Sequence, residues 1–529
     1  MPMHAVRANV MARKDPISHT QAMPKKVSLK SGNGGKCARE APPQEVISKR
    51  TKVEEAASTF KSSNDSQEHN FFSWLLNISR VEFFRKYFEK KHLVASHGSG
   101  EYFQIGLPGV VPPVEWSTKH MLDHVKSHPS YYGTDLNVVR FDTKLKKRVS
   151  YKTEGLVDAG ELEMCMKKGW SVRFLRPNEF SESNSAFIAC MENEFHCYCG
   201  SNSYWTPANS QGFAPHYDDV DVFLLQLEGE KLWSLYDPPE KVGVLTRHSS
   251  EDYAPEQFPR PKHSITLRAG DALYMPRGVV HQGKTSSKTH SLHITFSANQ
   301  MNSWADFMSR AAQYTVETLA ANKLEWRCAL PRDVLQVMGG IHHPVFRDTN
   351  RLAALSAKQQ EKRACFQARV REMATELMFL LTNEENMDVC TDVYGKDTVQ
   401  KLQPPSRLYS GAAEASTELS HASRVRLISR NCVRMLLSVP GEARVYHIGG
   451  NSTVCLAGSL AELRFEADFA PAIATLLSSY PKMVTVGALP FPGFDDPEDV
   501  AENQLVLVEA FRDAGVLHIE SPANGHAPN

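Results

Sequence analysis

One His-x-Asp pair in the sequence has the spacing of a metal site. His216 and Asp218 lie two residues apart in 215–220, which we predict to be a strand, so that both side chains project from one face. A second histidine, His281, follows in the strand-like stretch 278–282. Two histidines and one carboxylate leave open positions on an iron(II) ion, as in non-haem oxygenases. The pattern therefore predicts a metal centre that suits iron(II).

The other histidine groups fit a metal site less well. His518 and Glu520 have a similar spacing but lack a second histidine in a strand. His120, His124 and His128 repeat at helical spacing with polar flanks, which favours a solvated helix face. An isolated His-x-Asp pair is usually a hydrogen-bonded surface histidine. The metal interpretation of His216 and Asp218 therefore depends on the surrounding elements.

The residues around the pair predict short strands separated by turns. Glu228-Gly229-Glu230 is expected to turn the chain, so that 231–236 returns as a partner strand. Gly270-Asp271 marks another turn, and Pro276-Arg277-Gly278 marks the one that delivers His281. Such strands, with ligands on two of them, favour a double-stranded β-helix, the jelly-roll barrel. The mouth of a barrel is a natural place for a metal and a small ligand.

Several contiguous blocks in this region resemble the JmjC ribosomal oxygenases. The blocks are 202–207, 212–219, 225–231 and 275–278. Two later stretches, 330–333 and 338–340, are similar to the nucleolar branch of that family, the bifunctional histone lysine demethylases and protein histidyl hydroxylases. The resemblance covers roughly residues 170–340 and continues, more weakly, from 71 to the C-terminus. It implies an α+β chain with a JmjC, cupin-like barrel.

The resemblance also implies an activity and the residues that carry it. The family's enzymes use iron(II), 2-oxoglutarate and dioxygen to hydroxylate a histidine, here expected on a large-subunit ribosomal protein. His216, Asp218 and His281 would hold the iron, and Lys231 would pair with the far carboxylate of 2-oxoglutarate, for which a lysine supplies a fixed cation. Thr295, one inward step from Ser297, is expected to touch the cosubstrate. The implied substrate contacts are Arg173, Asn202, Tyr204 and Ser297.

Three alternatives remain open. A histone lysine demethylase would use the same iron chemistry on an N-methyl group, with a histone as its partner. Methyl-ammonium recognition favours aromatic or carboxylate walls, whereas Arg173, Asn202 and Ser297 suit a neutral imidazole. A zinc or manganese cupin isomerase would not need Lys231. A scaffold that has lost turnover would not need the complete set of ligands.

Composition and charge limit the other classes. The 529 residues imply several domains, and the 60 Lys and Arg balance the 60 Asp and Glu, so that bulk charge indicates no partner. No apolar run approaches a membrane span, and no signal-peptide core follows the start, so we expect no membrane association. The ten cysteines form no Cys-x-x-Cys pair, which fits a reduced compartment, cytosol or nucleus.

Residues 1–68 are expected to form a disordered basic tail. They carry twelve Lys or Arg against seven Asp or Glu, a net charge of +5, and Phe60 is their only aromatic residue. The basic cluster at 49–52 favours nuclear import, and the family resemblance favours the nucleolus. A mitochondrial presequence is the alternative, because Asp15 is the only acid among the first thirty residues.

The remaining chain divides into three expected domains. Residues 69–304 form the catalytic barrel with an N-terminal elaboration, and 305–400 form a helical region and linker. The apolar stripe of the helices in 305–385 and the family resemblance predict a homodimer. Residues 401–529, with helices at 462–479 and 503–514, resemble a winged helix. From His421 onward eight Lys or Arg face twelve Asp or Glu, a net charge of −4, which opposes nucleic-acid binding.

Overall fold

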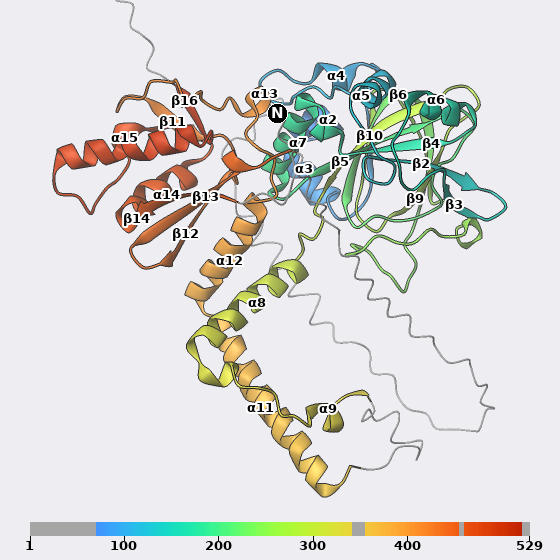
Figure 1. The fold of residues 1–529 in the computed structure, drawn as a ribbon. Helices are drawn as coiled ribbons and strands as arrows, with labels where there is room; N and C mark the ends of the chain where they lie inside the picture. Colours follow the sequence, from blue (N-terminus) through green and yellow to red (C-terminus); the bar gives the residue numbers. More distant parts are fainter. Residues whose placement is uncertain (1–69, 341–354, 454–459, 521–529) are drawn as a thin grey trace, which may run out of the picture. The chain divides into compact units, whose positions relative to one another are not determined.

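The computed structural model describes residues 70–340, 355–453 and 460–520 (Figure 1). The predicted basic tail lies outside the described residues. Within them, no helix combines the length and the apolar character that crossing a membrane requires.

A ten-stranded sheet forms the barrel, in the order β1-β8-β6-β10-β5-β4-β2-β3, with β7 and β9 paired to β6. Its pairs are antiparallel, which confirms the predicted double-stranded β-helix. The strands are β1 (Leu93–Ser96), β2 (Leu136–Asp142), β3 (Lys147–Ser150), β4 (Ser171–Leu175), β5 (Gly200–Thr206), β6 (Asp221–Tyr236), β7 (His263–Arg268), β8 (Asp271–Met275), β9 (Val280–Lys284) and β10 (Ser291–Ala298).

Strand β6 continues without a break through the predicted turn at Gly229, so the prediction of a return strand at 231–236 was wrong. The first half of β6 pairs with β8 and β10, and the second half pairs with β7 and β9. Gly229 has φ +64°, and a Cβ there would lie 1.8 Å from the carbonyl oxygen of His290. The glycine therefore bends one long strand around the barrel instead of reversing it.

The segment 215–220 is also not a strand. It runs as a loop, except that His216 forms an isolated antiparallel bridge with His281. Proline at 215 cannot donate a ladder hydrogen bond, which limits regular pairing at this point. His216 is therefore placed by a single bridge to β9, and Asp218 lies in the loop that follows.

Helices pack against the sheet and share one hydrophobic core with it. Helix α7 (Glu182–Phe195) is capped by Ser181 and buries Phe187 against Phe296 of β10. The other helices before the barrel closes are α2 (Phe71–Leu76), α3 (Arg80–Lys86), α4 (Tyr102–Ile105), α5 (Thr118–Ser127) and α6 (Ala159–Lys167). A cluster of phenylalanines joins α2 and α3 to the sheet, with Phe83 packed on Tyr274 of β8.

Helices follow the barrel, as predicted: α8 (Trp304–Asn322), α9 (Val334–Val337), α11 (Ala357–Leu381) and α12 (Glu384–Val399). The stretch 386–420, which its polar composition predicts to be a linker, begins as helix α12. Cys390 of α12 packs with Ala311 of α8, and Val393 packs with Leu436 of β12 (Val433–Val439). Tertiary packing therefore stabilises a helix that its polar sequence does not predict.

The C-terminal part contains two three-stranded sheets, β15-β11-β16 and β12-β13-β14. The remaining elements are α13 (Arg407–Ser410), β11 (Arg424–Leu427), β13 (Glu442–His447), β14 (Ala461–Glu466), α14 (Ala470–Ser479), β15 (Val484–Thr485), α15 (Pro497–Asp513) and β16 (Leu517–Glu520). The predicted helix at 462–479 was wrong in its first part, where β14 pairs with β13. The helix begins only at Ala470, with Pro471 in its first turn, a position that proline favours.

Candidate metal centre and cosubstrate pocket

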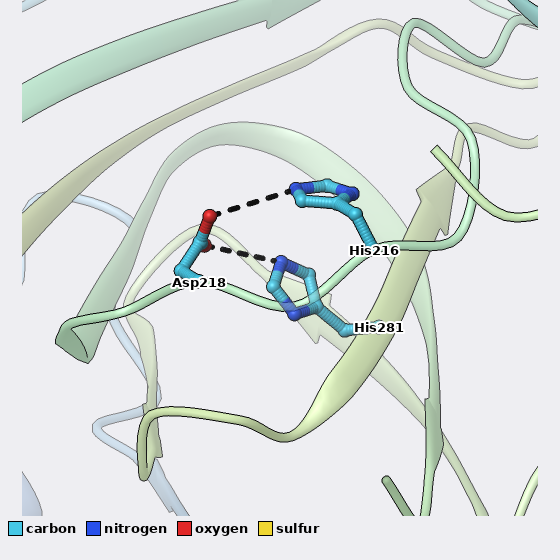
Figure 2. Close-up of side chains that lie close together, drawn as sticks. All are labelled: His216, Asp218 and His281. Atoms are coloured by element: carbon cyan, nitrogen blue, oxygen red, sulfur yellow. Dashed lines mark ion pairs between the residues drawn. The ribbon is translucent and has the colours of Figure 1, made fainter. Parts of the chain in front are cut away.

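The structure brings His216, Asp218 and His281 together at one end of the barrel. One nitrogen or oxygen from each lies within 4.8 Å of the others, the one such group found among the described residues. The Asp218 carboxylate oxygens lie 3.9 Å from Nε2 of His216 and 3.6 Å from Nε2 of His281. Figure 2 shows both imidazole rings turned toward this carboxylate. Their assignment as iron ligands stays a prediction.

Backbone carbonyl groups fix the orientation of both rings. Nδ1 of His216 lies 2.8 Å from the carbonyl oxygen of Ala214, and Nδ1 of His281 lies 3.0 Å from that of Val279. Because a carbonyl oxygen only accepts, each Nδ1 must donate its hydrogen, and Nε2 keeps a lone pair. This arrangement is typical of histidines that bind a metal through Nε2.

A buried ion network supports the loop that carries Asp218. Asp221 has no exposed surface, and burial raises its pKa although Arg277 beside it acts in the opposite direction. Arg277 donates from Nη1 to Asp221 at 2.9 Å and from Nη2 to Glu89 at 2.6 Å. The next residue, Gly278, donates its backbone N–H to the carbonyl oxygen of Asp218 at 2.9 Å. The network therefore connects the start of β6 to the turn that holds Asp218.

These donors fit a divalent transition metal. The set contains two imidazole nitrogens and one carboxylate oxygen, and it occupies only part of an octahedral shell. Burial, and then the neighbouring His216, lower the pKa of His281, which keeps its Nε2 unprotonated near neutral pH. The site can therefore hold iron(II) and leave positions for further ligands.

A narrow pocket extends from the three residues into the barrel. Its lining residues are Tyr204, Phe213, His216, Asp218, Val222, Leu224, Lys231, Trp233, Met275, His281, Gln282, Gly283, His293 and Thr295. The walls combine apolar side chains with polar and charged groups that can fix the orientation of a small ligand.

Lys231 is a buried cation in this pocket. It is 5% exposed, its Nζ donates to Oγ1 of Thr206 at 3.2 Å, and it lies 5.1 Å from the ring centre of Trp233. No carboxylate within the described part of the chain pairs with it. Burial lowers the pKa of Lys231 to about 7. An anion in the pocket would restore the charge, so the site is suited to a carboxylate.

Gly283 of β9 makes room for this lysine. A Cβ at position 283 would lie 2.8 Å from Cε of Lys231 and 3.2 Å from the ring of Trp233. Real Cβ atoms do not approach other atoms so closely, so any side chain here would displace the lysine. Position 283 therefore needs glycine because it has no side chain. The backbone conformation of Gly283 is ordinary.

Two of the predicted contact residues, Tyr204 and Thr295, line the pocket. Arg173 lies beside it on β4, where Nε and Nη2 donate to Oδ1 of Asn137 at 3.1 and 2.6 Å. Its guanidinium also lies 5.9 Å from the ring centre of Phe213, which does line the pocket. Arg173 is therefore placed at the pocket's aromatic wall rather than inside it.

Asn202 and Ser297 lie on neighbouring strands but are not among the lining residues. Asn202 of β5 stands opposite Thr295 of β10, and Oγ of Ser297 donates to the carbonyl oxygen of Gly200 at 3.4 Å. The structure therefore places both close to the barrel interior without bringing them to the three metal-binding candidates. Their roles as substrate contacts stay predictions.

The sequence prediction missed His293, Trp233 and Phe213. His293 lies on the same face of β10 as Thr295 and Ser297, because residues two apart share a face. The alternation along this strand that predicted an inward-facing Thr295 also predicts an inward-facing His293. The sequence therefore contained a signal for His293. Trp233 stands two residues after Lys231 on the same face of β6, whereas Phe213 lies in a loop and gives no periodic signal.

Comparisons with known protein families match two segments of the chain. Residues 173–307 match the family model described as JmjC domain. Residues 380–523 match the model described as ribosomal oxygenase 1, C-terminal winged helix domain. The first match contains the pocket, and the second confirms the predicted winged helix.

Curated relatives extend over most of the chain. Ribosomal oxygenase 1 of Danio rerio is 29% identical over 478 residues, which are 87% of this chain and 81% of that protein. The bifunctional lysine-specific demethylase and histidyl-hydroxylase NO66 of Dictyostelium discoideum is 30% identical over 443 residues, 81% of this chain and 80% of that protein. The solved structure of ycfD from E. coli aligns with a TM-score of 0.45 and 15% identity over 84% of this chain and 99% of that chain. The chain therefore belongs to the JmjC ribosomal oxygenases, the family of both relatives.

Proposed function

We propose that the protein is an iron(II)- and 2-oxoglutarate-dependent dioxygenase that hydroxylates a histidine side chain of a ribosomal protein. One observation carries this proposal: a single pocket contains the His216, Asp218 and His281 donor set and, deeper in the barrel, the buried cation of Lys231. The donor set suits iron(II), and the cation suits the far carboxylate of a dicarboxylate. The names of the relatives support a ribosomal protein or a histone as the substrate.

The chain's own residues position the reactants. His216 and His281 would bind the metal through Nε2, and their Nδ1 hydrogen bonds keep the rings from turning. When bound, iron(II) supplies the reaction of dioxygen with 2-oxoglutarate that yields succinate, carbon dioxide and the oxygen atom added to the substrate. Lys231 would hold the far carboxylate, and its binding energy would orient the cosubstrate for that reaction. The apolar walls at Leu224 and Met275 exclude water.

The wall chemistry favours a neutral imidazole over a methyl-ammonium group as the substrate. Asp218 is the only carboxylate among the lining residues, and it belongs to the metal-binding set. The cation of Arg173 at the ring of Phe213 opposes a second cation at that wall. An imidazole can instead stack on Tyr204 or Phe213 and accept hydrogen bonds. We assign the substrate contacts to Arg173, Asn202, Tyr204 and Ser297.

Histone lysine demethylation is the second candidate. The aromatic rings of Tyr204, Phe213 and Trp233 all line the pocket, and aromatic walls are what methyl-ammonium recognition uses. The name of the Dictyostelium relative includes this activity beside histidyl hydroxylation. The same iron centre would serve both reactions, so the substrate decides between them.

The proposal also includes a homodimer and a location in the nucleus, within the nucleolus. Large apolar side chains are exposed on the helices after the barrel: Trp304 at 82%, Met378 at 55% and Phe379 at 78%. Contact between two copies would cover these side chains. Light scattering on the full chain would give the mass of two chains, and a single-chain mass at micromolar concentration would contradict the dimer.

A competition experiment tests the substrate. The protein is incubated with iron(II), 2-oxoglutarate, a mixture of ribosomal proteins and peptides that contain trimethyl-lysine. We expect mass spectrometry to find a histidine that has gained one oxygen atom, and unchanged methyl-lysine. Loss of methyl groups with no oxidised histidine would favour the demethylase. The Asp218→Ala variant is the matched control, and it should give neither product.

A further inference from the structure

A second buried polar group, His293, stands in the pocket beside Lys231. Its side chain is 1% exposed, and it lines the pocket from β10. Within the described residues, Nδ1 of His293 has no hydrogen-bond partner, and neither has Nε1 of Trp233, which lines the same pocket. Buried polar atoms are nearly always paired in folded proteins. Two orphaned atoms that share one pocket therefore point to a ligand that pairs with them.

The imidazole and the lysine are held against the same indole ring. The ring centre of Trp233 lies 5.3 Å from that of His293, at an angle of 81°, and 5.1 Å from Nζ of Lys231. On its other side His293 stacks on Tyr204, with ring centres 4.9 Å apart and planes 7° apart. The two rings fix the plane of the imidazole. A fixed plane also fixes the direction in which an N–H can point.

The strand register places these groups on one inward face. His293 stands opposite Tyr204 in the β5–β10 ladder, and Ser291 stands opposite Thr206 two residues further along. Because Lys231 donates to Thr206, its ammonium reaches the same part of the barrel wall as His293. A carboxylate bound to Lys231 would therefore lie beside the imidazole of His293.

The protonation state of His293 suits an acceptor ligand. Burial, and then the charge of Lys231, hold the pKa of His293 well below its usual range, so the ring is neutral and carries one N–H. A carboxylate oxygen accepts from that N–H without adding a second cation to the pocket. Packing alone would explain the buried ring but not the missing partner of Nδ1, since leaving such an atom unpaired is costly.

We infer that His293 is a second anchor for the far carboxylate of 2-oxoglutarate, donating a hydrogen bond from its imidazole N–H beside the ammonium of Lys231. This inference rests on the proposed function, because it takes 2-oxoglutarate as the ligand. Lys231 supplies the charge, and His293 supplies a directional bond. Together they select a dicarboxylate of the right length over a shorter or singly charged acid.

The test combines a change in the protein with a change in the ligand. Calorimetry measures the binding of 2-oxoglutarate, and of 2-oxobutanoate, which lacks the far carboxylate, to the full chain loaded with cobalt(II). We expect His293→Phe to weaken 2-oxoglutarate binding at least about tenfold, the range of a hydrogen bond to a charged group, and to leave 2-oxobutanoate unchanged. The matched control is His290→Gln, because His290 pairs with Glu228 and does not line the pocket.

The other outcomes separate the two proposals. If His293→Phe binds both acids as the parent does, or loses both equally, the imidazole is only a packing residue and the inference is overturned. If the parent itself does not bind 2-oxoglutarate, the proposed function fails as well. If the variant does not fold, nitrogen NMR of the zinc-loaded parent with labelled histidine decides. There 2-oxoglutarate must shift the His293 resonances and 2-oxobutanoate must not, and equal responses overturn the inference.

Discussion

His216 and His281 form an isolated antiparallel backbone bridge. The N–H of His216 donates to the carbonyl oxygen of His281 at 3.2 Å, and the N–H of His281 donates to that of His216 at 2.8 Å. The two imidazoles are therefore set by a direct connection between their own backbones. Only Asp218 is placed from outside this pair, by the N–H of Gly278.

Asp218→Ala should remove metal binding and leave the fold intact. The variant takes away the one anionic ligand, while the backbone bridge between the two histidines remains. We expect titration with cobalt(II), followed by its visible absorption, to show a loss of affinity of at least about tenfold. The matched control is Asp219→Ala, because Asp219 pairs with Ser249 and Gln300 and lies outside the metal group. Equal cobalt affinity in the two variants would contradict the assignment.

Lys231→Met should stabilise the ligand-free protein at neutral pH. Burial lowers the pKa of Lys231 from 10.5 to about 7, so the folded state carries a costly charge at and below pH 7. Between pH 7 and 10.5 the unfolded chain binds a proton that the folded chain does not. The free energy of unfolding of the parent therefore rises with pH in this window, by up to about 1.4 kcal/mol per pH unit from this group.

The measurement is thermal unfolding of the parent and Lys231→Met between pH 6 and 9. The variant should melt higher than the parent at pH 7, and the gap should shrink as the pH rises. Lys262→Met serves as the control, because Lys262 is exposed and pairs with Asp237. A gap that does not depend on pH, or a variant that melts lower at pH 7, would show that Lys231 is not a buried charge.

Gly283→Ala should weaken cosubstrate binding without affecting the metal. The added methyl group would lie 2.8 Å from Cε of Lys231, so the ammonium has to move while the backbone does not. Since small displacements of a binding group are costly, we expect 2-oxoglutarate affinity to fall about tenfold or more. Calorimetry with 2-oxoglutarate and with cobalt(II) checks both parts. Gly340→Ala, where nothing lies within 4 Å, is the control, and parent-like affinity in Gly283→Ala would refute the crowding.

Arg277→Met alone should lower the free energy of unfolding more than the double variant Arg277→Met/Asp221→Asn does. Removing the guanidinium leaves the carboxylate of Asp221 buried without its cation, which typically costs about 3–5 kcal/mol. Neutralising Asp221 as well removes the uncompensated charge, so the double variant should recover part of the loss. Urea unfolding of the parent, both single variants and the double variant gives the coupling. Strictly additive losses would mean that the two residues do not stabilise the turn as a pair.

Local sequence signals predicted the elements that a short stretch of chain determines. The apolar stripe in 305–385 predicted helices, which the structure has as α8, α9 and α11, and the spacing of His216 and Asp218 predicted that they lie together. Long-range pairing was not visible in the same way. Gly229 has the sequence signal of a turn, but partners on both sides of β6 keep the strand continuous.

Contacts between distant residues decided what the sequence could not predict. The role of Gly283 depends on the Lys231 side chain lying against it, and this contact follows only from the pairing of β6 with β9. The polar residues of α12 predicted a linker, yet Cys390 and Val393 pack against α8 and β12. In each case the missing information was the partner, because burial and packing, unlike periodicity, are properties of two segments.

The most direct test of the account follows both products of one turnover. The protein is incubated with iron(II), 2-oxoglutarate, isotopically labelled dioxygen and large-subunit ribosomal proteins, and succinate and the protein masses are measured together. We expect one labelled oxygen atom on a histidine for each succinate formed, and neither product with Asp218→Ala. Succinate formed without labelled histidine, or a histidine whose added oxygen does not come from dioxygen, would contradict the account.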